Sequence, residues 1–167
     1  PLDVKKVQDL RALIGGQGSI RLDGNRVWGL KEALLFVDLA GRAQIEFMEE
    51  PLSDIGKIGE FYQATQMPVA LDETLPLSVD SQAVKYYVLK PTVLGGIIPC
   101  LDWMENARRS GKKAVISSAF ESPVGLKVLA NLACLTGTTA GLGTERWLNG
   151  VEPLADAGGI IRKEKLR

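Results

Sequence analysis

Hydrophobic and polar positions along the chain form two kinds of pattern, one typical of helices and one typical of strands, and the two kinds alternate. Segments with apolar residues every three to four positions indicate helices, and short runs of Val, Ile, Leu and aromatic residues indicate strands. The predicted helices span residues 3–15, 29–42, 53–66, 78–84, 95–111 and 122–137. The predicted strands span residues 19–25, 44–51, 67–74, 85–92, 112–120 and 139–144. Six strands that alternate with helices predict a parallel sheet covered by helices.

Two architectures share this alternation, a doubly wound open sheet and a (β/α) barrel. An open sheet of the dinucleotide-binding type carries a G-x-G-x-x-G turn after its first strand. The corresponding turn here reads "LDGNRVW", residues 22–28, and lacks that pattern. The apolar runs "YYVL" and "AVI" are typical of strands that are buried on both faces. The missing turn disfavours the open sheet and leaves a (β/α) barrel, with about six βα units in this chain, as the alternative that the strand ends can test.

Polar and acidic residues recur where the predicted strands end. The carboxyl ends of barrel strands meet at one face, which is where barrel enzymes keep their active sites. A single acid at such a position is ordinary in a turn, but acids on three consecutive strands followed by a lysine indicate a site. In chain order these residues are Asp23, Glu49, Glu50, Asp72, Glu73, Lys90, Ser117, Ser118 and Gly141.

Composition narrows the chemistry that such a site can perform. The chain has 167 residues and no histidine, which excludes a Ser-His triad and the usual zinc ligand. Lys plus Arg equals Asp plus Glu at 20 each, so no charge excess predicts nucleic acid or an anionic membrane as partner. Cys100 and Cys134 both lie in apolar helical patterns, and we predict them to be reduced core residues of a cytoplasmic protein.

Three carboxylates without histidine suit a hard divalent cation such as Mg²⁺. Mg²⁺ keeps positions for substrate oxygens, so it can hold a substrate carboxylate while a proton beside that carboxylate is removed. Lys90 follows "YYVL" and precedes a proline, and it would add a second positive group near that charge. The pattern thus predicts a Mg²⁺ site and a catalytic lysine acting on a small carboxylate.

Five motifs, in this order and spacing, closely resemble the barrel of the o-succinylbenzoate synthase family within the enolase superfamily. They are "RLDGNRVW", "FMEEP", "ALDET", "VLKPT" and "VISSAFES", and the resemblance runs from about residue 3 to about residue 148. The resemblance implies that Lys90 faces the substrate as proton acceptor or cationic stabiliser. It also implies Mg²⁺ ligation by Asp23, Glu49 and Asp72, orienting roles for Asn25, Glu50 and Glu73, and substrate contacts by Ser117, Ser118 and Gly141.

The activity that the resemblance implies is a Mg²⁺-dependent syn elimination of water through an enediolate. It yields o-succinylbenzoate in menaquinone or phylloquinone biosynthesis. An N-acylamino acid racemase or a cycloisomerase of the same superfamily stays open as an alternative, since the racemase uses the same ligands. A non-catalytic barrel fragment is the alternative from another class.

The resemblance also predicts how the chain is organised. We expect a partial barrel over residues 1–148 and a tail over residues 149–167. The family's capping domain and the first barrel strands, with a Lys-x-Lys base, would lie outside this chain. "DVKKVQDL", residues 3–10, has adjacent lysines on a helix instead. The predicted partners are therefore a small carboxylate substrate and that N-terminal segment.

Overall fold

The protein is described by a computed structural model, which defines residues 2–77 and 82–144. Its strands form one sheet in the order β1-β2-β3-β4-β5, so that each strand neighbours the next one in the sequence. The pairs β1–β2 and β2–β3 are parallel. Sequential parallel strands joined by helical crossovers are the repeating unit of a (β/α) barrel. The predicted fold class, part of a (β/α) barrel, is confirmed.

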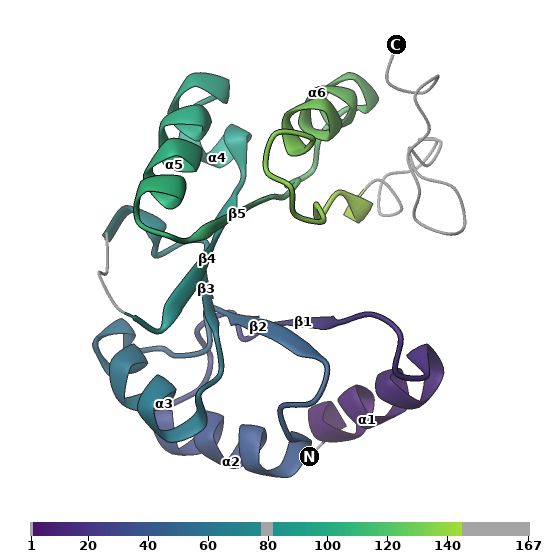
Figure 1. Ribbon diagram of the computed structural model, residues 1–167, viewed down its shortest axis with the longest axis vertical. Helices are drawn as coiled ribbons and strands as arrows, with labels where there is room; N and C mark the ends of the chain where they lie inside the picture. Colours follow the sequence, from purple (N-terminus) through teal and green to yellow (C-terminus); the bar gives the residue numbers. More distant parts are fainter. Residues whose placement is uncertain (1, 78–81, 145–167) are drawn as a thin grey trace. The chain divides into compact units, whose positions relative to one another are not determined.

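The chain divides into two compact units, Pro1–Tyr86 and Tyr87–Arg167, and the boundary falls inside β4. In the first unit three helices run along one side of the strands β1 to β3 (Figure 1). The elements of this unit are α1 (Leu2–Ile14), β1 (Ile20–Asp23), α2 (Leu30–Ala40), β2 (Ile45–Glu49), η1 (Ile55–Lys57), α3 (Ile58–Thr65), β3 (Val69–Leu71), η2 (Leu75–Leu77) and the start of β4 (Val84–Leu89).

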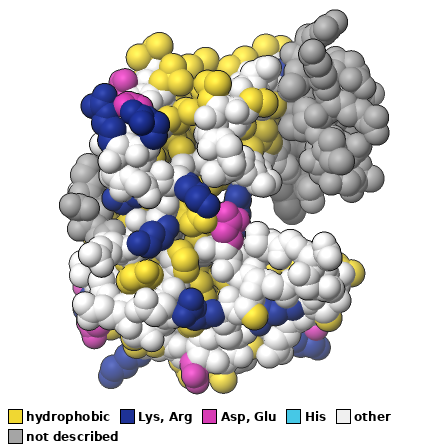
Figure 2. All heavy atoms as spheres, viewed as in Figure 1, with side chains coloured by type: hydrophobic (Ala, Val, Ile, Leu, Met, Phe, Trp, Pro, Cys, Tyr) yellow, Lys and Arg dark blue, Asp and Glu magenta, His cyan; other side chains and the backbone are white. Residues whose placement is uncertain are grey.

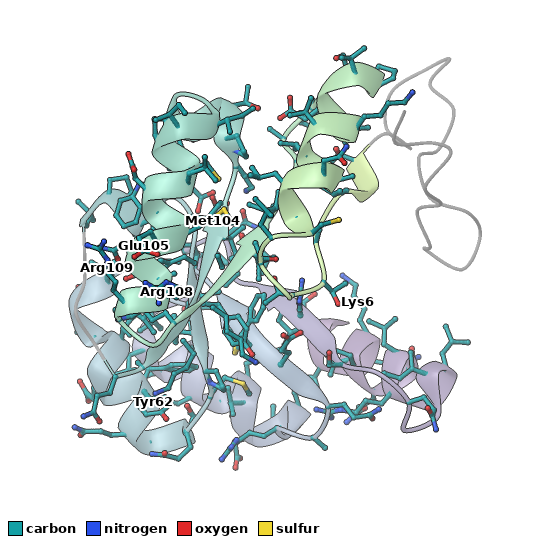
Figure 3. The ribbon with its side chains drawn as sticks, turned by 45° about the horizontal axis from the view of Figure 1, so that its top comes forward. Lys6, Tyr62, Met104, Glu105, Arg108 and Arg109 are labelled. Carbon is teal, nitrogen blue, oxygen red and sulfur yellow. The ribbon has the colours of Figure 1, made fainter. Side chains whose placement is uncertain are left out.

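The core of the first unit reaches both faces of its central strands. Phe47 and Met48 are consecutive in β2 and therefore point to opposite faces, yet both are buried. The Phe47 ring lies 4.6 Å from the ring of Tyr86, and the Arg21 guanidinium lies 5.1 Å above it. On the outer side, Lys85 lies 5.6 Å from the ring of Tyr62, which Figure 3 labels on α3. Strands that are buried on both faces are expected for a barrel wall.

Arg11 joins α1 to the end of α2. Its guanidinium donates hydrogen bonds to the carbonyl oxygens of Ala40, Gly41 (2.7 Å) and Ala43 (2.8 Å). The last carbonyls of a helix have no partner within the helix and carry its negative dipole end. The Arg11 guanidinium has several N–H donors for these carbonyl groups and a positive charge that is attracted to the negative end of the dipole. Arg11 therefore links α1 to the end of α2.

The second unit contains the rest of β4 and the units that follow it. Its elements are α4 (Pro91–Leu94), α5 (Ile97–Arg109), β5 (Lys113–Ile116) and α6 (Pro123–Ala133). Trp103 of α5 packs edge-on against Tyr87 with ring centroids 5.7 Å apart. Glu105 accepts hydrogen bonds from Arg108 and Arg109 near the end of the same helix (Figure 3).

The buried face of α5 is not the one that hydrophobicity alone favours. Ile97, Leu101 and Met104 recur at helical spacing, but Ile97 is 44% exposed and Leu101 is 37% exposed. The buried residues are Cys100 and Ala107, seven positions apart. Both buried side chains are small, whereas the larger Ile97 and Leu101 are exposed. Hydrophobic side chains are accordingly visible on the surface over α5 and α6 (Figure 2).

Three further predictions need correction or fall outside the described residues. The expected last strand, residues 139–144, is reduced to one parallel bridge between Ser117 and Gly141. The expected helix at 78–84 lies partly outside the described residues, and Val84 already belongs to β4. The predicted tail, residues 149–167, also lies outside them.

The two cysteines are both free, as predicted, but only one of them is a core residue. Cys100 is buried on the inner face of α5. Cys134 is exposed, because it follows the last residue of α6 and its thiol turns back toward the carbonyl of Ala130 at 3.4 Å. The prediction that Cys134 is buried is therefore wrong.

Candidate functional site

The acids predicted to bind metal occupy consecutive strand ends in the first unit. Asp23 is the last residue of β1 and Glu49 the last residue of β2, and the two are partners in the parallel ladder. Glu49 is in turn the partner of Ala70 in β3. Asp72 follows two residues later, just beyond the end of β3, and is 8% exposed. The strand positions are those that the sequence predicted.

The loop after β1 lies directly against the end of β2. Gly24 donates its N–H to the carbonyl of Glu49 at 2.7 Å, and Arg26 donates to the carbonyl of Glu50 at 2.8 Å. A Cβ atom at position 24 would lie 2.8 Å from both the Glu50 oxygen and the Pro51 Cα. No side chain fits at that distance, so glycine is required there. This contact fixes Asp23, the preceding residue, beside β2.

The three residues predicted to orient the ligands differ in their surroundings. The N–H of Asn25 donates to the Asp23 carboxylate at 2.9 Å, with Asn25 in the left-handed region (φ 46°). Glu50 is buried, and its carboxylate accepts hydrogen bonds from Asp72 and Thr74. Glu73, in contrast, is exposed. Thr74 did not stand out in the sequence as a functional residue, although "ALDET" places it directly after the acids.

The donor set fits a hard cation by its chemistry. Asp23, Glu49 and Asp72 offer only oxygen atoms, which Mg²⁺ and Ca²⁺ prefer. Within residues 2–77 and 82–144, however, no three His, Cys, Asp or Glu side chains are gathered at the spacing of a metal site. The structure thus brings Asp23 and Glu49 into register without drawing Asp72 into a three-ligand group.

The remaining predicted residues belong to the second unit. Lys90 is half-buried and directly precedes α4, whose Val93 and Leu94 N–H groups donate to the Lys90 carbonyl. Ser117 and Ser118 follow β5, and the hydroxyls of both donate to the carbonyl of Gly141, at 3.2 and 3.3 Å. The structure therefore brings the two serines and the glycine together, although Ser117 and Gly141 are 24 positions apart in the sequence.

Ser118 and Gly141 also have structural tasks in this corner. Ser118 is buried and its hydroxyl shares a hydrogen bond with that of Thr144 at 2.8 Å. A Cβ atom at Gly141 would lie 3.2 Å from the Ser117 hydroxyl oxygen. Ser117 is less buried than Ser118, so its hydroxyl is the more accessible of the two.

Three carboxyl or thiol groups of the described residues show clear pKa shifts with evident causes. Burial acts to raise the pKa of Glu46, but the hydrogen bond and charge of Arg21, 2.8 Å away, lower it below its usual value. Burial raises the pKa of the Cys100 thiol to about 11. Hydrogen bonds from Arg108 and Arg109 lower the pKa of the Glu105 carboxyl to about 2. None of these groups belongs to the predicted ligand set.

Residues 2–148 match the family described as enolase C-terminal domain-like. The fold and the acids at its strand ends agree with this match, and the chain belongs to that family. Among its relatives is an o-succinylbenzoate synthase from Aliivibrio fischeri (strain MJ11), which is 39% identical over 122 residues. That alignment covers 69% of this chain and 38% of the relative, so the chain spans well under half of the synthase.

Solved structures share the fold. The crystal structure of MenC from Desulfotalea psychrophila LSv54 has a TM-score of 0.77 and 25% identity, over 90% of this chain and 46% of that one. A dipeptide epimerase from Cytophaga hutchinsonii, complexed with Mg and the dipeptide D-Ala-L-Val, has a TM-score of 0.73 and 23% identity. It covers 84% of this chain and 40% of the epimerase. In the part of the chain that the structure describes, no helix has the length and apolar character needed to cross a bilayer.

Proposed function

We propose that this chain forms part of a Mg²⁺-dependent o-succinylbenzoate synthase, a lyase that removes water from a succinyl-hydroxycyclohexadiene carboxylate. The observation that carries the proposal is the pairing of Asp23 with Glu49 at the ends of adjacent strands, followed by buried Asp72 after the next strand. The identity to the Aliivibrio synthase supports this reaction over others of the superfamily. The product would serve menaquinone or phylloquinone biosynthesis in the cytoplasm.

In this proposal Asp23, Glu49 and Asp72 hold the cation through their carboxylate oxygens. A divalent cation there supplies a positive charge that stabilises negative charge developing on a substrate carboxylate. The loop after β1 and the turn after β3 keep these acids at their strand ends, and a bound cation would draw the three carboxylates together. A cation also removes the repulsion between Asp23 and Glu49.

Lys90 and the corner formed by Ser117, Ser118 and Gly141 act on the substrate in this proposal. The Lys90 ammonium would stabilise the developing charge and hold a proton at Nζ. The Ser117 hydroxyl would bind the succinyl part of the substrate, while Ser118 and the close approach at Gly141 shape the corner. The family resemblance supports these roles.

The base that removes the substrate proton would belong to a Lys-x-Lys strand in an N-terminal segment, which we propose as partner of this chain. The decisive assay therefore uses the full-length protein and two substrates, the cyclohexadiene carboxylate and an N-acylamino acid. Mg²⁺-dependent dehydration is the expected result. Racemisation alone would replace the synthase proposal by the racemase, and a full-length protein inactive on both would leave a non-catalytic barrel.

A further inference from the structure

Glu50 joins three parts of the first unit through its main chain and side chain. Its N–H donates to the carbonyl of Ala70 in β3 at 3.0 Å, and its own carbonyl accepts from Arg26 after β1. Its φ of 41° lies in the left-handed region, which non-glycine residues seldom adopt. The chain thus turns sharply after Glu49, and the two neighbouring acids are separated. Glu49 stays at the strand end, and Glu50 is 2% exposed.

One oxygen of the Glu50 carboxylate accepts three hydrogen bonds from the turn after β3. The donors are the Asp72 N–H at 2.9 Å, the Thr74 N–H at 2.9 Å and the Thr74 hydroxyl at 2.7 Å. A buried carboxylate is stable only when such donors replace its water. Thr74 is also buried, which protects these bonds from competing solvent.

These contacts matter because Asp72 lies beyond the regular part of β3. The strand ends at Leu71, and the Asp72 N–H is bound by the Glu50 side chain. The Asp72 carbonyl accepts from Leu75, which closes the turn. The backbone of residues 72–75 is therefore held from inside by this one carboxylate.

The family resemblance implies an orienting role for Glu50. We infer that Thr74 is a further positioning residue: its two hydrogen bonds to the Glu50 carboxylate hold that carboxylate where it binds the Asp72 N–H, and so hold the turn that carries Asp72. This inference rests on the proposed function, because it assigns Asp72 as a ligand of a divalent cation. Groups that orient a metal ligand commonly affect metal affinity by 10–100-fold when they are changed.

The test replaces Thr74 by valine, which keeps its shape and N–H but removes the hydroxyl. Calorimetric titration of the 167-residue chain with MgCl₂ should show roughly tenfold weaker binding in Thr74→Val, and Thr74→Ser should restore it. Amide hydrogen exchange at Asp72 should become about tenfold faster in Thr74→Val. The Glu50 oxygen that accepts from the Asp72 N–H loses its hydrogen bond from the Thr74 hydroxyl in this variant and is held less firmly. Should Thr74→Val fail to fold, Glu50→Gln, which keeps the shape and one acceptor oxygen, should show the same weakening.

Thr65→Val is the matched control. The Thr65 hydroxyl donates to the Phe61 carbonyl at 2.7 Å and accepts from the Met67 N–H at 3.1 Å, both away from the acids. This variant should lose stability and keep its Mg²⁺ affinity. Unchanged affinity in Thr74→Val, with wild-type binding still lost in Asp72→Asn, would overturn the positioning role and leave the metal site standing. A wild-type chain that binds no Mg²⁺ would overturn the metal site and the positioning role together.

Discussion

Asp23 and Glu49 face each other in the parallel ladder of β1 and β2, and each is the last residue of its strand. Like charges directly opposite each other in a sheet are destabilising when no cation lies between them. The same arrangement would favour the proposed binding of Mg²⁺. A site of this kind lowers the stability of the metal-free protein and raises its affinity for the metal. The stability and the metal affinity can be measured separately.

Asp23→Asn should therefore raise the stability of the metal-free protein and lower its affinity for Mg²⁺. Without metal, the free energy of unfolding should rise by about 0.2–1 kcal/mol, because one of two opposed charges is removed. The asparagine oxygen can still accept from the Asn25 N–H, so the loop keeps its contact. Mg²⁺ affinity should fall. Urea unfolding and calorimetry check the two parts, and a loss of stability in the metal-free variant would contradict the proposed repulsion.

Asp72→Asn in the full-length enzyme should lower Mg²⁺ affinity and turnover together. The substitution keeps the shape and leaves the backbone N–H to Glu50 intact, but it removes a ligand charge. Turnover measured across a Mg²⁺ titration checks this. Asp72 is not a ligand if the variant keeps wild-type affinity and full turnover at saturating Mg²⁺.

Lys90→Ala should reduce turnover of the full-length enzyme by about 10²-fold or more, since the lysine acts on charge that develops during the reaction. Its stability should change much less. Lys90→Arg should not restore turnover, because guanidinium is bulkier and keeps its proton near neutral pH. Lys85→Ala is the control on the same strand, because Lys85 contacts the ring of Tyr62. A Lys90→Ala variant that unfolds would make Lys90 a structural residue.

Arg11→Ala should lower the free energy of unfolding by about 1.5–3 kcal/mol, since charged hydrogen bonds to three carbonyl groups are lost. Arg109→Ala removes an arginine of similar helical position whose partner, Glu105, is on the surface. That control should leave the free energy of unfolding nearly unchanged, because the pair is exposed to solvent. Chemical denaturation compares the two, and equal effects would contradict the capping role of Arg11.

The Arg21–Glu46 pair should make stability depend on pH in the acid range. The pKa of Glu46 is lowered in the folded state, so the pair stabilises the protein above the ordinary value of 4.5 and this contribution is lost as pH falls through the folded pKa. The stability difference between wild type and Glu46→Gln should therefore shrink as the pH falls from above 4.5 through the lowered folded-state pKa of Glu46. Glu105→Gln, in a solvent-exposed pair, is the control with a small effect. A difference that stays constant with pH would contradict the linkage.

The order of elements and the strand-end acids could be predicted because they depend on local patterns. The strand "VAL" at 69–71 is apolar throughout, and Asp23, Glu49 and Asp72 each lie at or directly after the end of a strand. The inner face of α5 could not be predicted in this way. Its buried residues, Cys100 and Ala107, are small, and hydrophobicity favoured the larger Ile97 and Leu101.

The support around Asp72 was also beyond the sequence pattern. Glu49 and Glu50 look alike as adjacent acids, and only the left-handed turn at Glu50 separates an accessible carboxylate from a buried one. Thr74 gains its importance from a contact with a residue 24 positions earlier. Spacing along the chain carries no signal for such a contact.

The two thiols of the second unit differ in exposure, so their reaction rates can report on local opening of this unit. Cys134 is exposed, so a maleimide dye added to the native protein should attach there and give a single labelled position. Cys100 is buried and its pKa of about 11 leaves almost no thiolate near neutral pH. Once Cys134 is blocked, the rate at which a second reagent reaches Cys100 measures how often α5 lifts from the sheet. Opening of this unit can thus be timed without introducing any substitution.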